Sequence, residues 1–344
     1  MLIGVSDEEF RKQAGIELWK KDHDYYYGSY SSYYIHEEML KDTVRTRTYQ
    51  RAIEDNPQDF KDKIVLDIGC GTGILSIFAA RAGAKHVYAI ENAEIALYAE
   101  EIIKRNNLSH KITVIKGKME EITLPVPKVD IIISEWMGYF LLYESMLDSV
   151  LWARDKYLVE GGKLLPDKCH IYVAALEDGD YKAQKRHFWD DVYGVNMSVM
   201  APTVMREPLV DVVQGDAVMS DSCQVCELDL NTMKPGDVEF SSEYVLRAKY
   251  DDKVHAMIGW WDTEFSRLTN PVTLSTSPFQ KATHWKQTVF YLEHDLDVKK
   301  GDVISGSIAN RKSKTNFREL DIKISYHINT DRVKRDFTNM YKLR

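Results

Sequence analysis

A glycine-rich turn between an apolar run and a helical pattern constrains the fold of this chain most strongly. Residues 64–68 (Ile-Val-Leu-Asp-Ile) form the apolar run, and residues 69–73 (Gly-Cys-Gly-Thr-Gly) follow it at once. Residues 75–82 then carry apolar side chains at helical spacing. Strand, glycine turn and helix in this order predict the start of a parallel α/β domain that binds a ligand at the turn.

The alternation of strand and helix patterns continues after this turn. Further strands are expected at residues 87–90, 111–115 and 129–134, with a helix over 93–106. Alternating patterns of this kind predict a doubly wound parallel sheet, because each parallel connection needs a crossover segment. Ligands of such sheets bind at the carboxyl ends of the strands.

Two details of the turn indicate which ligand it serves. The glycines follow a Gly-x-Gly-x-Gly spacing, and Asp67 precedes them on the strand. A carboxylate beside the turn attracts the cationic S-adenosylmethionine and would repel a pyrophosphate. Glu91, about 20 residues further on, is placed to accept from ribose hydroxyls. S-adenosylmethionine is therefore favoured; a nicotinamide cofactor and a purely structural turn remain alternatives.

Two glutamates lie in one of the most apolar stretches of the chain, residues 131–147. On one continuous helix, Glu135 and Glu144 would face opposite sides, so a shared site requires a bend. Met137-Gly138 is the expected bend, between a buried strand and a helix that starts over residues 143–151. The pair then forms a clamp for a cation. The alternative is that one glutamate caps the helix while the other is solvated.

Several separated motifs, taken together, resemble the protein arginine N-methyltransferases, and the resemblance runs through nearly the whole chain. It is strongest to the type I members, which form asymmetric dimethylarginine. The motifs are residues 65–73, 134–138, 143–146 and 283–285, with residues 35–42 and 285–288 indicating type I.

The resemblance implies a Rossmann-like S-adenosylmethionine-dependent methyltransferase domain over residues 36–166, in the α/β class. A helical segment, residues 1–35, would close over the cofactor. A β-barrel substrate domain would follow over residues 167–344, with a helical dimerisation arm at about 179–205.

The implied reaction is methyl transfer from S-adenosylmethionine to guanidinium nitrogens of protein arginines, with S-adenosylhomocysteine as the other product. Substrates would be glycine/arginine-rich segments of RNA-binding proteins and histones. Glu135 and Glu144 would orient and polarise the planar, permanently charged guanidinium, and His284 with Asp42 would take up its proton. The alternative is a catalytically silent regulatory or scaffold paralogue, which we disfavour because all these residues are present.

The resemblance also assigns residues around the cofactor and the acceptor nitrogen. The cofactor contacts would be His36, Arg45, Asp67, Gly69, Glu91, Met119, Glu120 and Tyr30; the residues shaping substrate and product would be Met39, Met146 and Tyr26. Without the resemblance, His36 and Arg45 would be interpreted as residues of a solvated helix face, and Tyr26 and Tyr30 as part of an aromatic docking surface. His284 and the methionines likewise read as core or interface residues.

After residue 167 the apolar pattern changes to period two, which predicts strands. Residues 181–197 interrupt them with Phe188, Trp189, Val192 and Tyr193 at helical spacing. In the family this position holds the arm, which implies a homodimer or a hetero-oligomer with a related chain. The alternative is a helix packed on its own barrel. The strands are expected at 170–175, 239–248, 255–265, 286–292, 303–308 and 320–326.

Composition limits the remaining possibilities. The chain has 344 residues and a net charge of -8, which suits two domains and a cationic partner but not nonspecific nucleic-acid binding. No apolar stretch is long enough for a membrane span, and the N-terminus does not resemble a signal peptide. We expect a soluble protein of the cytoplasm and nucleus, without a metal. Cys223 and Cys226 lack a second pair of ligands for zinc.

Overall fold

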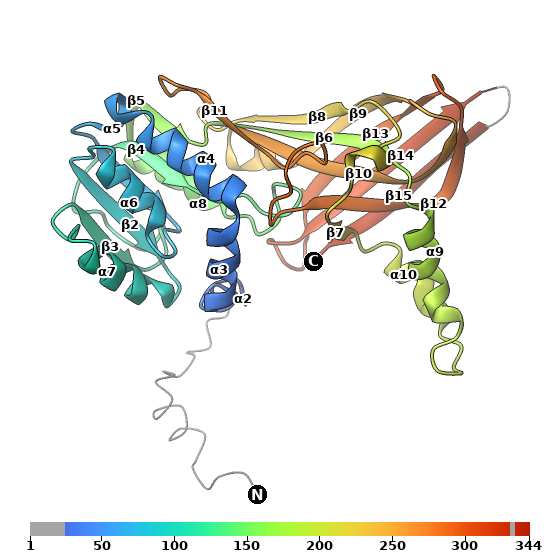
Figure 1. Cartoon of the computed structure of the whole chain (residues 1–344), viewed down its shortest axis with the longest axis horizontal. Coiled ribbons are helices and arrows are strands. Elements are labelled where there is room, and N and C mark those ends of the chain that lie inside the picture. Colours follow the sequence, from blue (N-terminus) through green and yellow to red (C-terminus); the bar gives the residue numbers. More distant parts are fainter. Residues whose placement is uncertain (1–24, 331–333) are drawn as a thin grey trace, which may run out of the picture.

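The computed structural model describes residues 25–330 and 334–344 (Figure 1). Most of the helical segment expected over residues 1–35 therefore lies outside the described residues. The described chain forms a parallel α/β part and an elongated antiparallel β part side by side, with helix α9 (Gly179–His187) projecting from the antiparallel part (Figure 1).

The α/β part is built on a parallel sheet with the strand order β3-β2-β1-β4-β5. The order runs outward from β1 in both directions, so the sheet changes direction between β1 and β4, as doubly wound sheets do. The strands are β1 Ile64–Ile68, β2 His86–Glu91, β3 Ile112–Lys116, β4 Val129–Ser134 and β5 Leu158–Leu165, and the crossover helices are α6 Ile74–Arg81, α7 Ile95–Arg105 and α8 Leu147–Tyr157.

The central strands form because both faces of this sheet are covered. Val65, Leu66 and Ile68 of β1 are buried, and so are the four residues from Ile131 to Ser134 of β4. Near-continuous apolar runs are typical of parallel strands between two helical layers. Asp67 is buried among them, which marks it as a residue retained for something other than core packing.

Four helices precede the sheet: α2 Tyr25–Ser29, α3 Tyr33–Lys41, α4 Thr43–Glu54 and α5 Pro57–Phe60. Helix α4 begins at a defined cap, because the Asp42 side chain accepts a hydrogen bond from the Arg45 amide at 3.0 Å. Its buried face includes Arg45 and Tyr49. The hydroxyl of Tyr49 donates to the Ser134 carbonyl at the end of β4. Helices α2 and α3 are thereby held near the carboxyl ends of the strands.

The second half of the chain forms two antiparallel sheets, with the orders β7-β12-β10-β6-β8 and β15-β14-β13-β9; β11 pairs with β10. A parallel α/β domain followed by an antiparallel β domain confirms the predicted fold class. Closure of the two sheets into a barrel stays a prediction. The strands are β6 Lys168–Leu176, β7 Leu209–Asp211, β8 Cys223–Asp229, β9 Phe240–Arg247, β10 Asp252–Phe265, β11 Val272–Ser275, β12 Gln287–Val298, β13 Val303–Lys312, β14 Leu320–Asn329 and β15 Lys334–Leu343.

The arm is not the single helix that the sequence predicts over residues 181–197. Helix α9 ends at His187, and short helical turns follow at Phe188–Asp190, Ser198–Met200 and Ala201–Val204 (α10). The continuous helix was wrong because Tyr193 and Gly194 adopt left-handed backbone angles, with φ of 52° and 84°. The apolar side chains at helical spacing are instead exposed: Phe188 is 56% and Tyr193 fully accessible.

Contacts between the two parts place a segment of the antiparallel half beside the parallel sheet. The Trp285 indole nitrogen donates to the Met137 carbonyl at 2.8 Å. The rings of Tyr49 and Phe265 meet edge to face at 5.0 Å. Within the described ranges, none of the helices is both long and apolar enough to cross a membrane, and no cluster of three or more metal-ligand side chains occurs.

Candidate active site

A cavity lies at the carboxyl ends of β1, β2 and β4, under helices α2 and α3. It is lined by residues from the glycine turn, from the loop after β4 and from the N-terminal helices. Of the residues expected at the site, those that line it are Tyr26, Tyr30, His36, Met39, Arg45, Gly69, Glu91, Met119, Glu135, Glu144 and Met146. Asp42, Asp67, Glu120 and His284 lie outside this lining.

The glycine turn brings backbone atoms to the cavity. Gly69, Gly71 and Gly73 all have left-handed φ angles, from 54° to 81°. The left-handed backbone at Gly71 favours glycine, and a Cβ atom there would already lie 3.4 Å from the His36 ring. His36 is buried, its Nε2 lies 2.8 Å from the Tyr30 carbonyl, and burial lowers its pKa. The imidazole is therefore neutral near pH 7.

Glu91 ends β2 and turns its carboxylate toward the glycine turn. Its Oε2 accepts from the Gly71 amide at 2.9 Å and its Oε1 from the Ala93 amide at 2.8 Å. Burial raises the pKa of Glu91, while these amide donors oppose that effect. A carboxylate fixed in this way keeps lone pairs available for a hydroxyl-bearing ligand in the cavity.

Asp67 and Glu120 do not reach the cavity directly. Asp67 is fully buried behind the turn, where Ser76 Oγ donates to its Oδ2 at 2.6 Å and burial raises its pKa to about 7. Its Oδ1 has no hydrogen-bond partner among the described residues. Glu120 is exposed and accepts from Ser149, which does line the cavity. Their contacts with a cofactor stay predictions.

The two glutamates of the apolar stretch both line the cavity, although they come from different parts of one loop. Glu135 directly follows β4 and accepts from Arg45 Nε at 2.7 Å, with side chains that are 8% and 9% exposed. Glu144 accepts from the Tyr30 hydroxyl at 2.9 Å. One carboxylate is thus held by Arg45 of α4 and the other by Tyr30, which directly follows α2.

The loop between the glutamates adopts an unusual backbone. Phe140, Leu141, Glu144 and Ser145 all have left-handed φ angles, between 48° and 79°. Helix α8 consequently begins at Leu147, with Met146 as its cap residue. The expectation that residues 143–151 start the helix was wrong by about one turn, because left-handed residues cannot continue a right-handed helix. Glu144 does not cap that helix.

A close backbone approach closes this loop. A Cβ atom on Gly138 would lie 2.1 Å from the Tyr143 carbonyl oxygen, which no other residue could tolerate. The Gly138 amide also donates to Leu141 at 2.9 Å. The bend expected at Met137-Gly138 is therefore present, and it returns the chain so that Glu144 meets the cavity that Glu135 borders.

Opposing effects act on the pKa of Glu144. Burial raises its pKa to about 7, and the negative charge of Glu135 adds to that effect. The hydrogen bond from Tyr30 and the positive charge of Arg318 act in the opposite direction. A cationic ligand between the two carboxylates would favour the charged form of both.

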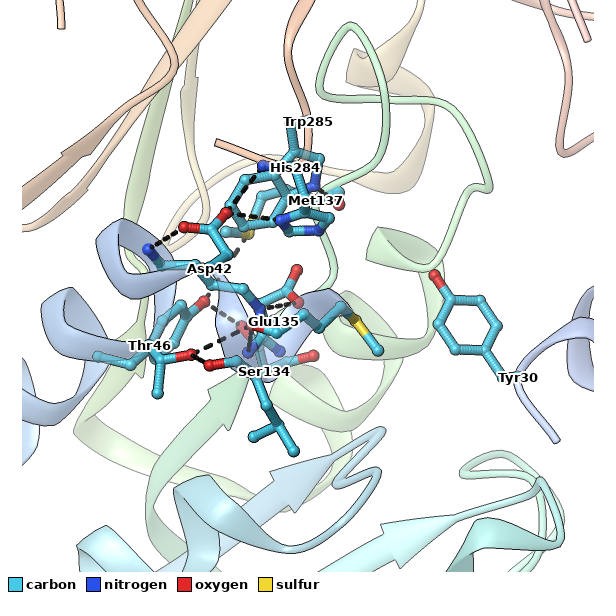
Figure 2. A network of polar contacts seen from close by, with 12 residues as sticks. Tyr30, Asp42, Thr46, Ser134, Glu135, Met137, His284 and Trp285 are labelled. Atoms are coloured by element: carbon cyan, nitrogen blue, oxygen red, sulfur yellow. Dashed lines mark hydrogen bonds and ion pairs between the residues drawn. The ribbon is translucent and has the colours of Figure 1, made fainter. Parts of the chain in front are cut away.

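His284 meets Asp42 near Glu135, as Figure 2 shows. The His284 ring Nδ1 lies 2.7 Å from Asp42 Oδ2, and the His284 amide donates to the same oxygen at 2.9 Å. Burial would raise the pKa of Asp42, but the hydrogen bonds from His284 and from the Arg45 amide outweigh it and hold the pKa below its usual value. Asp42 thus joins the antiparallel half to the cap of α4, and through α4 to Arg45 and Glu135.

Sequence reasoning gave no role to Arg318 or to Ser149. Ser149 lies on the first turn of α8 and lines the cavity. Arg318 lies in the connection between β13 and β14 and contacts both Glu144 and Tyr26. No local pattern signals either contact, because both depend on where α8 and the connection pack.

The residues of the cavity fit S-adenosylmethionine. The glycine turn leaves room for a ligand against the backbone, and the buried Glu91 carboxylate suits ribose hydroxyls. Met119 is buried and offers an apolar wall. Two carboxylates that line the same cavity suit a planar cation with several N–H donors, such as a guanidinium.

Comparisons with known proteins agree with this geometry. Residues 167–331 match the model of the arginine methyltransferase oligomerization subdomain, and residues 46–147 match that of the ribosomal protein L11 methyltransferase (PrmA). Protein arginine N-methyltransferase 1 of Schizosaccharomyces pombe is 56% identical over 319 residues, which are 93% of each chain. The protein of the same name from Chlamydomonas reinhardtii is 54% identical over 321 residues, also 93% of each chain.

Solved structures agree as well. The Trypanosoma brucei PRMT1 enzyme-prozyme heterotetrameric complex with AdoHcy contains a chain with a TM-score of 0.89 and 42% identity, covering 92% of this chain and 100% of that one. Protein arginine methyltransferase 10 of Arabidopsis thaliana has a TM-score of 0.85 and 32% identity, covering 93% of this chain and 100% of its own. The chain therefore belongs to the protein arginine N-methyltransferase family.

Proposed function

We propose that this protein transfers methyl groups from S-adenosylmethionine to guanidinium nitrogens of protein arginines, forming monomethylarginine and asymmetric dimethylarginine. The observation that carries the proposal is the pair Glu135 and Glu144, two carboxylates bordering one cavity that the glycine turn and the buried Glu91 also line. The names of the relatives support the reaction class. Type I product identity and glycine/arginine-rich substrates in RNA-binding proteins and histones are part of the proposal.

The cofactor would be held along the turn. Glu91 would accept from the ribose hydroxyls, the amides of the glycine turn would border the methionine portion, and Met119 would lie against the adenine. The bound cofactor supplies an electrophilic methyl group on a positively charged sulfur. Tyr26 of α2 and Tyr30, which directly follows this helix, line the cavity and would exclude water from the reacting atoms.

Glu135 and Glu144 would hold the substrate guanidinium by charge-assisted hydrogen bonds from two directions. Holding it in one orientation aims one terminal nitrogen and opposes the repulsion between two cations. Glu135 is already paired with Arg45, so the two carboxylates and this one arginine carry a net charge of -1 when all are ionised. The site therefore attracts a cation.

The methylated nitrogen must lose a proton. The His284 ring faces Asp42, and an imidazole hydrogen-bonded to a carboxylate at Nδ1 presents its other nitrogen as a base. Met39 and Met146 line the cavity and would limit the space beside the acceptor nitrogen. These two side chains would thereby influence which nitrogen receives the second methyl group.

An oligomer is the proposed working unit. The matched oligomerization subdomain supports assembly, and the projecting α9 arm with exposed Phe188 and Tyr193 supports contact through that arm. One solved relative is an enzyme-prozyme heterotetramer. We propose a dimer through the arm, either of identical chains or with a related chain.

The direct test incubates the protein with labelled S-adenosylmethionine and a glycine-arginine peptide, followed by amino-acid analysis of the product. Labelled asymmetric dimethylarginine is expected. Symmetric dimethylarginine would refute the type I assignment. Binding of S-adenosylhomocysteine by calorimetry without any transfer, even with a related chain added, would instead support the silent scaffold. Binding of a nicotinamide dinucleotide in its place would refute the cofactor assignment.

A further inference from the structure

The connection between β13 and β14 reaches across the molecule to the second glutamate of the clamp. The Glu144 amide donates to the Arg318 carbonyl at 2.8 Å, and Arg318 Nη1 donates back to the Glu144 carbonyl at 2.6 Å. Ser145 Oγ donates to the Phe317 carbonyl at 2.7 Å. Two neighbouring residues of the clamp loop are therefore fixed by two neighbouring residues of the antiparallel domain.

These hydrogen bonds fall where the backbone is strained. Glu144 and Ser145 have φ angles of 79° and 56°. Non-glycine residues in this region keep their conformation only where surrounding contacts impose it. The amide and the carbonyl of Glu144 both bond to Arg318, so this contact fixes the direction in which the Glu144 carboxylate points.

The same guanidinium also contacts the helix that covers the cavity. The Arg318 Cζ atom lies 4.0 Å from the centre of the Tyr26 ring and 5.4 Å from that of Tyr27. A guanidinium at this distance over an aromatic face is attracted to the ring. Tyr26 and Tyr30 lie on and just after α2 with their rings 4.8 Å apart, and Tyr30 donates to Glu144. Arg318, α2 and Glu144 thus form a closed set of contacts.

We propose that Arg318 is a positioning residue that holds Glu144 in its clamp orientation and holds α2 over the cofactor cavity, so that the acceptor clamp and the cofactor cover are set by one side chain. The inference rests on the proposed function. It assigns to the antiparallel domain a direct part in the site: its hairpin connection completes the clamp that the parallel domain begins.

The charge of Arg318 adds a distinct signature. Among the described residues, the groups that interact with the Glu144 carboxyl include Tyr26 and Tyr30 from the α2 segment, Glu135 and Tyr139 from the loop after β4, and Arg318. Burial and Glu135 raise the pKa of Glu144, whereas Tyr30, Arg318 and Tyr26 lower it. Removing the positive charge must raise this pKa further. The acidic limb of kcat/KM for the arginine peptide must then move to higher pH.

The test compares Arg318→Gln and Arg318→Lys with the matched control Arg311→Gln. Arg311 lies on the same hairpin, is half exposed and pairs with Asp321 away from the cavity. Arg318→Gln is expected to lower kcat/KM by about 10-fold or more at saturating cofactor and to shift the acidic limb to higher pH. Arg318→Lys should return the acidic limb of kcat/KM to its wild-type pH, because lysine restores the positive charge. Arg311→Gln should match the wild type in both measurements.

Two measurements that do not use catalysis complete the test. In the protein without cofactor, Arg318→Gln should speed hydrogen exchange at residues 26–30, and it should weaken S-adenosylhomocysteine binding several-fold in calorimetry. A double variant that combines Arg318→Gln with Tyr26→Leu tests whether Arg318 acts through Tyr26. In that case the double variant should bind S-adenosylhomocysteine no more weakly than the weaker-binding of the two single variants. Independent, additive losses would contradict that route.

The outcomes are separable. A wild-type enzyme that binds cofactor but transfers no methyl group refutes the proposed function, whereas an active wild type with Arg318→Gln equal to Arg311→Gln refutes this inference. If Arg318→Gln loses activity only in proportion to its loss of folded protein, with an unmoved acidic limb and unchanged exchange in α2, the residue is merely structural and the inference is wrong.

Discussion

At the scale of single residues, the site depends on groups whose charge is set by their surroundings. Glu144 has a pKa raised to about 7 by burial, with the Tyr30 hydrogen bond opposing the shift. Activity that needs charged Glu144 must therefore fall as the pH drops through that region. Asp42 is the opposite case, with a pKa below its usual value because His284 and the Arg45 amide donate to it. The pKa values of these two carboxyl groups are therefore shifted in opposite directions.

Replacing Tyr30 with Phe removes the hydroxyl that donates to Glu144 at 2.9 Å. The carboxylate loses a stabilising hydrogen bond, so the pKa of Glu144 rises and the acidic limb of kcat/KM moves to higher pH. The measurement is a pH profile with an arginine peptide at saturating cofactor. Tyr33→Phe is the control, because the Tyr33 hydroxyl bonds the exposed Tyr98 instead. An unmoved limb in Tyr30→Phe, or an equal shift in the control, would contradict this account of Glu144.

At the level of secondary-structure elements, the loop after β4 brings Glu135 and Glu144 to the same cavity. Strands β1 and β4 could be predicted because their apolar runs are buried on both faces of the sheet. The loop could not, because its left-handed residues, Phe140 and Leu141 among them, have side chains that normally favour other conformations. The apolar pattern includes residues 143–146, so helix α8 was predicted to begin about one turn before Leu147, where it starts.

Gly138→Ala tests whether this loop geometry is required. The added methyl group would collide with the Tyr143 carbonyl at 2.1 Å, so the loop must open and carry Glu144 away from the cavity. We expect a destabilisation of about 3 kcal/mol and a loss of methyl transfer. The matched control is Gly236→Ala, since a Cβ there meets nothing within 4 Å. Chemical denaturation and the peptide assay measure both effects. A variant as stable and active as the control would refute the strained loop.

Elements with weak patterns were also missed. Strand β5 (Leu158–Leu165) contains Gly161 and Gly162, which disfavour strand assignment. The arm was predicted as one helix from its apolar spacing, but Tyr193 and Gly194 reverse the chain instead. In both segments, tertiary packing determines the backbone conformation, and the apolar pattern alone does not predict it.

At the scale of the whole molecule, the site exists because distant segments meet. His284 and Asp42 are 242 positions apart in sequence and share a hydrogen bond. Their pairing was available only through the family resemblance, since one sequence contains no information about which loop of the antiparallel domain reaches the parallel sheet. The contact of Arg318 with Glu144, 174 positions apart, was not anticipated at all.

The proposed dimer is tested at the same scale. Tyr193 is fully accessible at the tip of the arm, so Tyr193→Asp should not disturb the fold of one chain but should weaken contact through the arm. Light scattering after size exclusion should show a smaller species with an unchanged melting temperature. Tyr250→Asp, at another exposed tyrosine in the connection after β9, serves as the control. Equal masses for wild type and Tyr193→Asp at all concentrations would contradict assembly through the arm tip.

We propose a division of roles in which the two glutamates act on the acceptor guanidinium and not on the cofactor. Its most direct measurement is Glu144→Gln, with cofactor affinity from calorimetry and turnover from the peptide assay, beside Glu160→Gln on the exposed end of β5. We expect Glu144→Gln to bind S-adenosylhomocysteine within a few-fold of the wild type while turnover falls by orders of magnitude. Equal losses of affinity and turnover, or a turnover matching Glu160→Gln, would contradict the clamp.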